Sequence, residues 1–489
     1  MSSRPLVKPS LLDALIPVIL LIAMLAGTVY VFGLDSSGPN QVALFLAAAV
    51  AAVIGIKNGL TWKQVEQGMI DTITVSLPAI LILFMVGALI GSWILAGTVP
   101  SMIYYGVEIM SPDYFYMTCC LVCALIGFSV GSSWTVAGTL GIGFMGIAAA
   151  LDLSLPISAG AIISGAYFGD KLSPLSDTTN LAAAVTNSDL FDHIQHMLWT
   201  TVPSFVITLV IFFALGMGSA INVQVDDIEI LQAAMQNAFL VNPFMLTPLV
   251  LLLVMAIMRK PALSTLICGV VAGCIFAVIF QWDAVITLAA DASLSSSAAI
   301  FKGLFTAMFL GFNSVSGNES MDALLSKGGM ESMLLTIGLI INAMGFGGAM
   351  ARTGLLERIV EAALSRVKSA GGLINTTIAT CIGTNILAAD QYLSIVIPGQ
   401  MFSEAYKRRN LRAINLSRTL EDSGTLTSVL VPWNTCGAFM SATLGVSTFY
   451  YAPYAFFNIC CPLIAIIYGF YQIKLPLINE PEGVAQSSD

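Results

Sequence analysis

The chain has 489 residues, of which 57% are hydrophobic and only 10% are charged. A soluble fold of this length does not bury so much apolar surface, so the composition predicts an all-α polytopic membrane protein. The formal net charge of −9 provides no basic face for phosphates, which argues against nucleic acid as a partner.

Eight apolar stretches have the length of single membrane-spanning helices, which need about 20 residues. In chain order they are Leu11 to Phe32, Gln41 to Ile56, Ile73 to Ala96, Leu198 to Met217, Pro243 to Met258, Leu263 to Phe280, Met333 to Ala351 and Ala452 to Tyr471. The first stretch continues to Phe32 without an A-x-A cleavage pattern, so we expect a retained span and not a signal peptide. The amphipathic stretches Lys57 to Asp71 and Ser314 to Lys327 are expected to lie along the membrane interfaces.

Four further apolar regions are interrupted by glycine, proline and polar residues. They are Tyr114 to Ala150, Ile157 to Val185, Leu373 to Phe402 and Leu426 to Leu444. Non-helical backbone at membrane depth persists only where protein or a water-filled cavity satisfies its polar groups. We therefore expect broken helices that line a site.

The placement of Lys and Arg predicts the orientation of the chain. Basic residues collect at Arg4 and Lys8, at Lys57 and Lys63, at Arg259 and Lys260, from Arg352 to Lys368, and from Lys407 to Arg418. The positive-inside rule assigns these segments, and with them both termini, to the cytoplasm. The spans satisfy this constraint only if 114–150 and 373–402 are re-entrant hairpins that enter and leave on one side.

The two halves of the chain resemble each other at a shift of about 250 positions, as inverted-repeat transporters do. This shift places Gly131 on Gly383 and Asp170 on Asp422. The predicted fold is two inverted repeats, each of five crossings plus one re-entrant hairpin, with broken helices at the midplane. The predicted boundaries are 1–220 for the first repeat (hairpin 114–150, broken helix 157–185), 221–242 for an acidic extracytoplasmic linker, 243–474 for the second repeat (hairpin 373–402, broken helix 413–444) and 475–489 for a cytoplasmic tail.

The stretch GAIISGAYFGDKLSPLSDTTN, Gly160 to Asn180, places Asp170 and Asp177 inside an apolar region. Ionisable residues at membrane depth are costly and by default indicate function, although a pair at the lipid interface is the alternative. Carboxylate oxygens suit Na⁺ or H⁺ and not a soft metal. In the second half, Arg418 lies four residues before Asp422, so an ion pair within one helix is an equally good interpretation there.

The predicted Na⁺ ligands are therefore Asp170, Asp177 and Asp422. The full set of predicted ion-binding residues is Asp170, Asp177, Asp390, Asp422, Ser133, Thr135, Thr178, Thr179, Asn180, Asn385, Ser423, Thr425 and Asn434. The small hydroxyl residues among them have a second interpretation as helix caps.

Two other motifs have plain structural interpretations. His193 and His196 form an H-x-x-H without a third ligand, so solvated loop residues are expected in preference to a metal site. Gly87 and Gly91 form a GxxxG, which indicates close helix packing.

The block GAIISGAYFGDKLSPLSDTTNLAAAV resembles the NhaC family of Na⁺/H⁺ antiporters. GSSWTVAGTLGIGFMGI, AMGFGGAMARTG and EDSGTLTSVLVPWNTCGAFMSATLGV are also similar to that family, so the resemblance covers most of the chain. It implies membership of the ion transporter superfamily, with inverted repeats, paired hairpins and elevator-type alternating access. The family also includes malate–lactate exchangers that use Na⁺ and H⁺, and Arg352 in AMARTG could pair with such a carboxylate.

We predict a secondary antiporter that exchanges Na⁺ for H⁺ across a bacterial-type inner membrane, and not an enzyme. The carboxylates would compete for Na⁺ and H⁺, which near neutral pH requires burial to raise at least one carboxyl pKa. The alternative is a Na⁺/H⁺-coupled organic-anion exchanger of the malate/lactate type. No cofactor is expected; the expected partners are membrane lipids, Na⁺ and H⁺, while a small carboxylate and a homodimer stay open. An enzyme fits the sequence less well because the two histidines lack a nucleophile partner. A channel also fits the sequence less well, because it needs a repeated polar filter.

Overall fold

The computed structural model describes residues 7–33, 37–218, 225–291, 293–365, 367 and 369–478. Within these ranges the secondary structure is helical, apart from two isolated bridging pairs, Phe312 with Lys327 and Leu411 with Leu477. Among the described residues, eight helices are long and apolar enough to cross a membrane, or up to ten if two bent pairs each form one span. The predicted class of an all-α polytopic membrane protein is therefore confirmed.

The uninterrupted apolar stretches form helices close to their predicted bounds. They are α1 (Leu11–Phe32), α2 (Ser37–Lys57), α3 (Trp62–Leu95), α10 (Leu190–Gly216), α12 (Thr247–Ile257), α13 (Ala262–Phe280), α17 (Leu334–Arg352) and α25 (Phe456–Tyr471). The amphipathic stretch Lys57 to Asp71 does not form a helix of its own. Thr61 caps α3, and the polar first turns of this helix continue into the apolar stretch that follows, so one helix of 34 residues forms.

The interrupted regions are broken helices, as predicted. The first half contains α5 (Phe115–Val130), α6 (Ser133–Val136), the π-helical η3 (Ala137–Gly141), α7 (Ile142–Ala150), α8 (Leu155–Leu172) and α9 (Asp177–Thr186). The second half contains α19 (Ala370–Leu387), α20 (Gln391–Arg408), α21 (Ala413–Leu420), the π-helical η7 (Glu421–Thr425), α22 (Leu426–Ser428) and α23 (Thr435–Leu444). The helices break at 131–132, 173–176, 388–390 and 429–434.

Several shorter helices were not predicted because they have neither the length nor the apolar run of a span. They are α4 (Thr98–Ile109), α11 (Val225–Ala238), α14 (Trp282–Ala289), α15 (Ser296–Phe309), α18 (Leu355–Leu364) and α24 (Thr448–Tyr451). The expected stretch at Ser314 to Lys327 contains one short helix, α16 (Glu319–Leu325).

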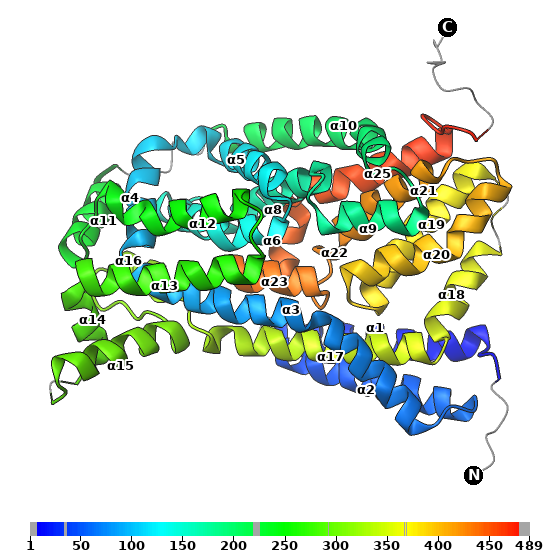
Figure 1. Ribbon diagram of the computed structural model, residues 1–489, viewed down its shortest axis with the longest axis horizontal. Coiled ribbons are helices and arrows are strands. Elements are labelled where there is room, and N and C mark those ends of the chain that lie inside the picture. The colour runs from blue at the N-terminus through cyan, green and yellow to red at the C-terminus, as the bar shows by residue number, and fades with distance from the viewer. Residues whose placement is uncertain are drawn as a thin grey trace, which may run out of the picture.

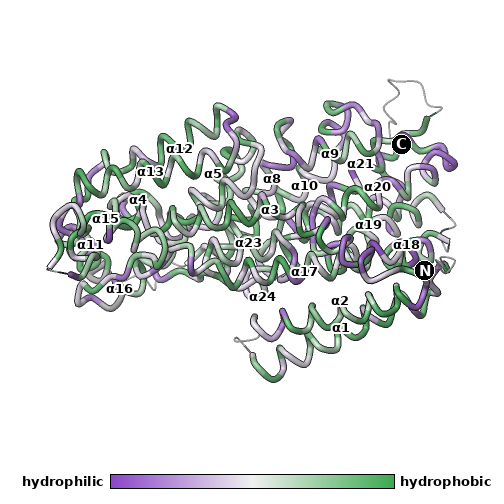
Figure 2. Tube along the Cα trace, turned by 60° about the horizontal axis from the view of Figure 1, so that its bottom comes forward, coloured by the Kyte–Doolittle hydropathy of each residue, from purple (hydrophilic) through white to green (hydrophobic). Residues whose placement is uncertain are grey.

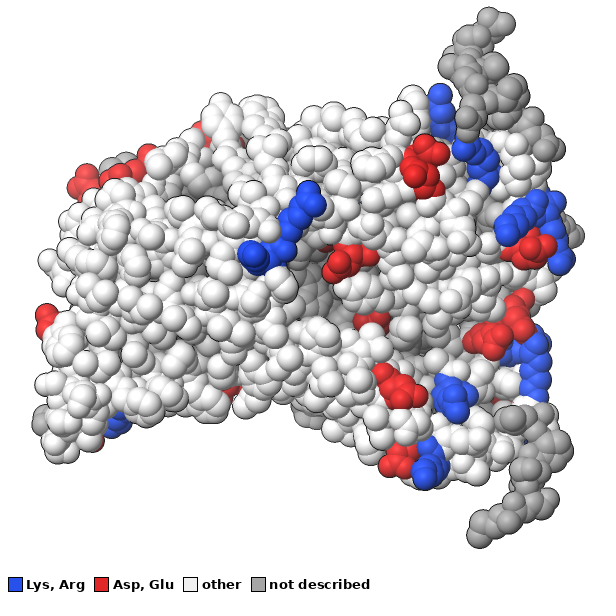
Figure 3. Space-filling view, viewed as in Figure 1, with Lys and Arg blue, Asp and Glu red and all other residues white. Residues whose placement is uncertain are grey.

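The long helices run roughly along the long axis of the molecule (Figure 1). The pair α1 and α2 lies along one edge (Figure 2), where α2 packs on α17 and α1 packs on α18. On the face drawn in Figure 3, Lys and Arg side chains gather at the end where α18, α20 and α21 lie in Figure 1, and the opposite end carries mainly acidic side chains. On this face, the surface between the two ends carries few charges (Figure 3), as expected of a membrane protein.

Corresponding helices of the two halves begin at a constant spacing. Three pairs of helices, α6 and α20, α8 and α21, and α9 and α23, each begin 258 positions apart. Their first residues are Ser133 and Gln391, Leu155 and Ala413, and Asp177 and Thr435. At this spacing Asp170 pairs with Ser428, whereas the shift of about 250 positions pairs it with Asp422.

Two turns also recur in left-handed backbone conformations. Gly97 between α3 and α4 has φ 75°, and Gly354 between α17 and α18 has φ 71°. At the tips of the two broken regions, Gly131 has φ 70° and Ala389 has φ 57°, each directly before the residue that caps the next helix. The left-handed region favours glycine, so Ala389 is a strained position.

Candidate functional site

The helix breaks face a common cavity of about 440 Å³. Its wall includes the residues that begin four helices: Ser133 of α6, Asp177 of α9, Gln391 of α20 and Thr435 of α23. The remaining polar residues on the wall are Ser76, Ser132, Thr135, Asp170, Ser176, Thr178, Asp390 and Tyr392. Six of the predicted residues therefore meet at one cavity: Asp170, Asp177, Asp390, Ser133, Thr135 and Thr178.

Asp170 is fixed in place by the first broken region. Its Oδ2 accepts hydrogen bonds from the backbone N–H of Ser133 at 2.9 Å and from the Ser133 hydroxyl at 2.7 Å. At the corresponding positions of the second half, the Ser428 hydroxyl lies 3.3 Å from Oε1 of Gln391. The same two positions are thus joined in both halves, but only the first half places a carboxylate there.

Asp177 and Asp390 are the two other carboxyl groups on the cavity wall. Asp177 stands in the first turn of α9 and is exposed to the cavity. Asp390 is buried and caps α20, because its Oδ1 accepts the N–H of Leu393 at 3.0 Å. Tyr392 lines the same cavity. The lining contains no Lys or Arg among the described residues, so the cavity is suited to a cation.

Apolar residues from two long helices close the remaining wall. They are Val75, Pro78, Ala79 and Ile82 of α3, with Ala262 and Leu266 of α13. Figure 3 shows a hollow near the middle of this face of the molecule. Sequence reasoning did not identify Gln391, Tyr392 and Thr435, although their positions at helix starts after polar breaks would have been a signal.

Asp422 lies outside this cavity and has other partners. It is fully buried in the π-helical turn η7 and forms an ion pair with Lys171, which is also fully buried. Its Oδ1 also accepts the Thr200 hydroxyl at 2.9 Å, and its Oδ2 lies 3.8 Å from Nε of Arg418. The predicted alternative of an ion pair between Arg418 and Asp422 is therefore present, with Lys171 as the closer cation.

Glu421 is the neighbouring acid in the same turn. It is fully buried, and neither carboxyl oxygen has a hydrogen-bond partner within the part of the chain that the structure describes. No three His, Cys, Asp or Glu side chains among the described residues lie close enough together to hold a metal ion. Of the three predicted Na⁺ ligands, Asp170 and Asp177 therefore line the cavity, and Asp422 lies outside it.

Five other predicted residues stabilise the helix breaks or the helices beside them. Thr179 donates to the Lys171 carbonyl at 2.9 Å, and Asn180 donates to the Pro174 carbonyl at 2.9 Å. Asn385 and Asn434 are joined at 3.1 Å, Asn385 donates to the Gly424 carbonyl at 2.7 Å, and Asn434 caps α23. Ser423 donates to the Thr419 carbonyl one turn earlier at 2.6 Å. Thr425 is buried, and no hydrogen-bond partner of its hydroxyl is found among the described residues.

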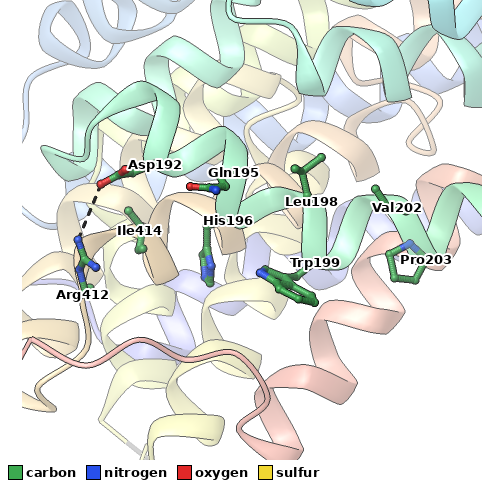
Figure 4. Close-up of a pocket in the computed structure, with 9 residues that line it drawn as sticks. All are labelled: Asp192, Gln195, His196, Leu198, Trp199, Val202, Pro203, Arg412 and Ile414. Atoms are coloured by element: carbon green, nitrogen blue, oxygen red, sulfur yellow. Dashed lines mark ion pairs between the residues drawn. The ribbon is translucent and has the colours of Figure 1, made fainter. Parts of the chain in front are cut away.

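A larger pocket of about 720 Å³ lies along α10 and contains His196 (Figure 4). His193 and His196 are both buried on α10, so their prediction as solvated loop residues is wrong. The helix begins at Leu190, and its first turns are covered by α9 and α21. This pocket is not the candidate ion site. Among the described residues that line it, Asp192 is the only carboxylate, and that group lies 3.8 Å from Arg412.

Two remaining predictions concern packing and substrate binding. Gly87 faces the backbone of Gly329, and Gly91 faces that of Ala307, so the GxxxG is a close-packing motif as predicted. Arg352 is exposed at the end of α17, beside Gly68 of α3, and is not on the cavity wall. It therefore lies outside the cavity in this conformation.

Comparison with known proteins identifies the family. The model of the Na⁺/H⁺ antiporter family matches residues 165–473. The chain is 38% identical to the Na⁺/H⁺ antiporter NhaC of Alkalihalophilus pseudofirmus, over 88% of this chain and 90% of that protein. It is 36% identical to the malate-2H⁺/Na⁺-lactate antiporter of Bacillus subtilis, over 94% of this chain and 95% of that protein. It is 35% identical to the arginine/ornithine antiporter ArcD of Halobacterium salinarum, over 99% of this chain and 96% of that protein. The chain therefore belongs to the Na⁺/H⁺ antiporter family.

Proposed function

We propose that the protein is a secondary antiporter that exchanges Na⁺ for H⁺ at the cavity between the helix breaks. The observation that carries this function is that Asp170, Asp177 and Asp390 lie on the wall of one cavity, whose described lining contains no Lys or Arg. Hydroxyl oxygens of Ser133, Ser176 and Thr178 stand beside these carboxyl groups as further hard ligands. Two relatives named as Na⁺/H⁺ antiporters support the same assignment.

The mechanism follows from competition at one site. Carboxylates of Asp170 and Asp177 hold either Na⁺ or a proton, and only the loaded site moves between the two sides of the membrane. The hydrogen bonds from Ser133 orient Asp170 in the Na⁺-bound form and stabilise its charge. We assign Asp422 to the support of the site and not to its first ligands, because Lys171 already neutralises it.

The arrangement that carries this movement is two inverted repeats, each of five crossings plus one re-entrant hairpin, which move in an elevator-like manner. The constant spacing of 258 between Ser133 and Gln391 and between Asp177 and Thr435, and the matching turns at Gly97 and Gly354, support the repeat. We assign the basic end in Figure 3, with both termini, to the cytoplasm of a bacterial-type cell.

A second candidate is a Na⁺/H⁺-coupled exchanger of a small carboxylate. Four helices direct their N-termini at the cavity, and the positive ends of helix dipoles bind anions. The malate/lactate and arginine/ornithine relatives are each named for substrates that carry a carboxylate. We place this candidate second because three carboxyl groups on the wall already balance the helix dipoles.

The two functions are separated by transport in proteoliposomes with the purified protein. A proton gradient, acidic inside, should drive Na⁺ uptake in the absence of any organic anion. Arg352→Gln is the matched control, because its side chain lies outside the cavity and should change uptake less than about fivefold, equivalent to under 1 kcal/mol. Uptake that requires malate, lactate or arginine would instead establish the second candidate.

A further inference from the structure

A second cavity, of about 530 Å³, lies toward the acidic end of the molecule. Residues of α4, of the segment around α16 and of the turn before α17 line it, and α4 and α16 lie at the end opposite to α18, α20 and α21 in Figure 1. Its polar lining residues are Asn313, Ser326, Lys327, Ser332 and Thr443. Among the described residues of this wall there is no Asp or Glu, so the second cavity does not offer the carboxylate ligands of the candidate ion cavity.

The same three helical segments line both cavities, each with a different part of its length. They are α3, the continuous stretch from α6 to α7, and α23. Their last residues on the candidate ion cavity are Ile82, Thr135 and Cys436, and their first residues on the second cavity are Ile90, Ile142 and Ala442. The gaps of eight, seven and six positions correspond to roughly 9–12 Å at a helical rise of about 1.5 Å per residue. A short barrier therefore separates the two cavities.

Two aromatic rings and one aliphatic side chain lie in this barrier. The rings of Trp134 and Phe439 are stacked, with centroids 4.1 Å apart and planes at 9°. Phe439 and Val86 of α3 are both fully buried. A Cβ built at Gly138 would lie 3.4 Å from Cγ2 of Val86 and 4.0 Å from Cζ of Phe439, so the three segments meet at this glycine.

The barrier carries no charged side chain on any of the three segments. Residues 83–89, 136–141 and 437–441 contain no Asp, Glu, Lys or Arg. A small ion pays several kcal/mol in lost hydration in such surroundings unless ligands replace the water. On the other side, α20 runs from Gln391 on the candidate ion cavity to Arg408 at the basic end. The candidate ion cavity thus lies between the barrier and the basic end.

We propose that Trp134, Phe439 and Val86 close the candidate ion cavity against the second cavity, and that the second cavity is the extracytoplasmic end of the transport path. This inference rests on the proposed function and adds the residues that prevent an ion from leaking through in this conformation. Exchange then requires α6 and α23 to move relative to α3, because the stacked rings join the first two and Gly138 brings them against the third.

The test measures access to the candidate ion cavity and not transport, so its outcome is independent of whether Na⁺ exchanges for H⁺. Asp177→Cys, exposed on the candidate ion cavity, is the single cysteine in full-length protein from which the nine native cysteines are removed. A membrane-impermeant methanethiosulfonate is added to right-side-out and inside-out vesicles in Na⁺-free medium at low temperature. We expect labelling from the cytoplasmic side to be at least tenfold faster than labelling from the outside. Adding Phe439→Ala should raise the rate from the outside at least tenfold, because removal of the ring joins the two cavities.

The matched control is Phe301→Ala, which removes a ring from another stacked pair, Phe301 and Phe305 at 4.1 Å, outside both cavities. It should leave the outside rate unchanged. Ser332→Cys, exposed on the second cavity, should be labelled from the outside in every background. Trp134→Phe keeps a ring in the stack and should retain the slow outside rate, and Trp134→Ala provides the second test if Phe439→Ala is unstable. Equal rates from the two sides with the barrier intact would overturn the proposal. So would an outside rate that Phe439→Ala and Trp134→Ala leave unchanged, or that Phe301→Ala raises equally.

Discussion

At the scale of single residues, the carboxyl groups of this protein divide into two kinds. Asp170, Asp177 and Asp390 line the cavity, where a cation can reach them. Asp422 is instead fully buried against Lys171, and Glu421 is buried beside it without a hydrogen bond. The first kind is suited to exchange a ligand, and the second is suited to hold the helices around the site in one arrangement.

Asp177→Asn should abolish Na⁺ uptake driven by a proton gradient while the protein stays folded. None of the ion pairs that the described residues form involves Asp177, so the substitution strands no buried partner. The measurement is uptake in proteoliposomes, with melting temperature as the check on folding. Asp152→Asn, at an exposed turn outside the cavity, is the matched control. Normal uptake by Asp177→Asn would remove Asp177 from the site.

Lys171→Met should destabilise the protein by about 3–5 kcal/mol, the usual cost of leaving one charge of a buried pair without its partner. Asp422 would then keep the Thr200 hydroxyl and the more distant Arg418 as its polar neighbours. The double variant Lys171→Met/Asp422→Asn should recover most of the loss, because no stranded charge remains. Thermal melting of both variants in detergent measures the difference. A Lys171→Met variant that melts at the same temperature as the unchanged protein would mean that the ion pair is energetically unimportant.

At the scale of secondary structure, left-handed turns set the angles between helices in both halves. Gly354 has φ 71°, and a Cβ built there would meet only Pro9, at an ordinary contact distance of 3.8 Å. Its requirement for glycine therefore comes from the backbone and not from crowding. Gly383 lies inside α19, and apart from its own stretch of helix no described atom lies within 4 Å of such a Cβ.

These two glycines form a matched pair for a stability measurement. Gly354→Ala should cost roughly 1–2 kcal/mol, because an L-residue is strained in the left-handed conformation. Gly383→Ala should be neutral or stabilising by up to about 1 kcal/mol, because alanine favours the helix. Melting temperatures of the two variants should therefore move apart. A loss at Gly383 as large as that at Gly354 would contradict the conformational explanation.

The sequence predicted the helix breaks well because their cause is local. Glycine, proline and hydroxyl residues interrupt apolar runs at 131–132 and 173–176, and each break begins a new capped helix. The partners of buried charges have no local cause. Lys171 and Asp422 are 251 positions apart, and the π-helical turn at 421–425 changes the side to which the acids point. His193 was mispredicted for a related reason, since the helices that cover it are distant in the sequence.

At the scale of the whole molecule, charge placement and the helix pattern together determine the expected orientation. Single cysteines at the exposed positions Asp152 and Glu404 test it in a background from which the nine native cysteines are removed. An impermeant thiol reagent should label Asp152→Cys from outside intact cells, and Glu404→Cys only after the membrane is opened. The reverse pattern at either position would mean that the broken region in that half crosses the membrane completely.

The stacking of Trp134 on Phe439 has a practical consequence. Their ring centroids are 4.1 Å apart and nearly parallel, at 9°, and this contact joins the first broken region of one half to α23 of the other. The indole is also part of the cavity wall. Because the emission of an indole depends on its immediate surroundings, Trp134 would report on occupancy of the cavity in a variant that lacks the other five tryptophans. A change in its emission would then follow ion binding in detergent, without any transport and without an attached dye.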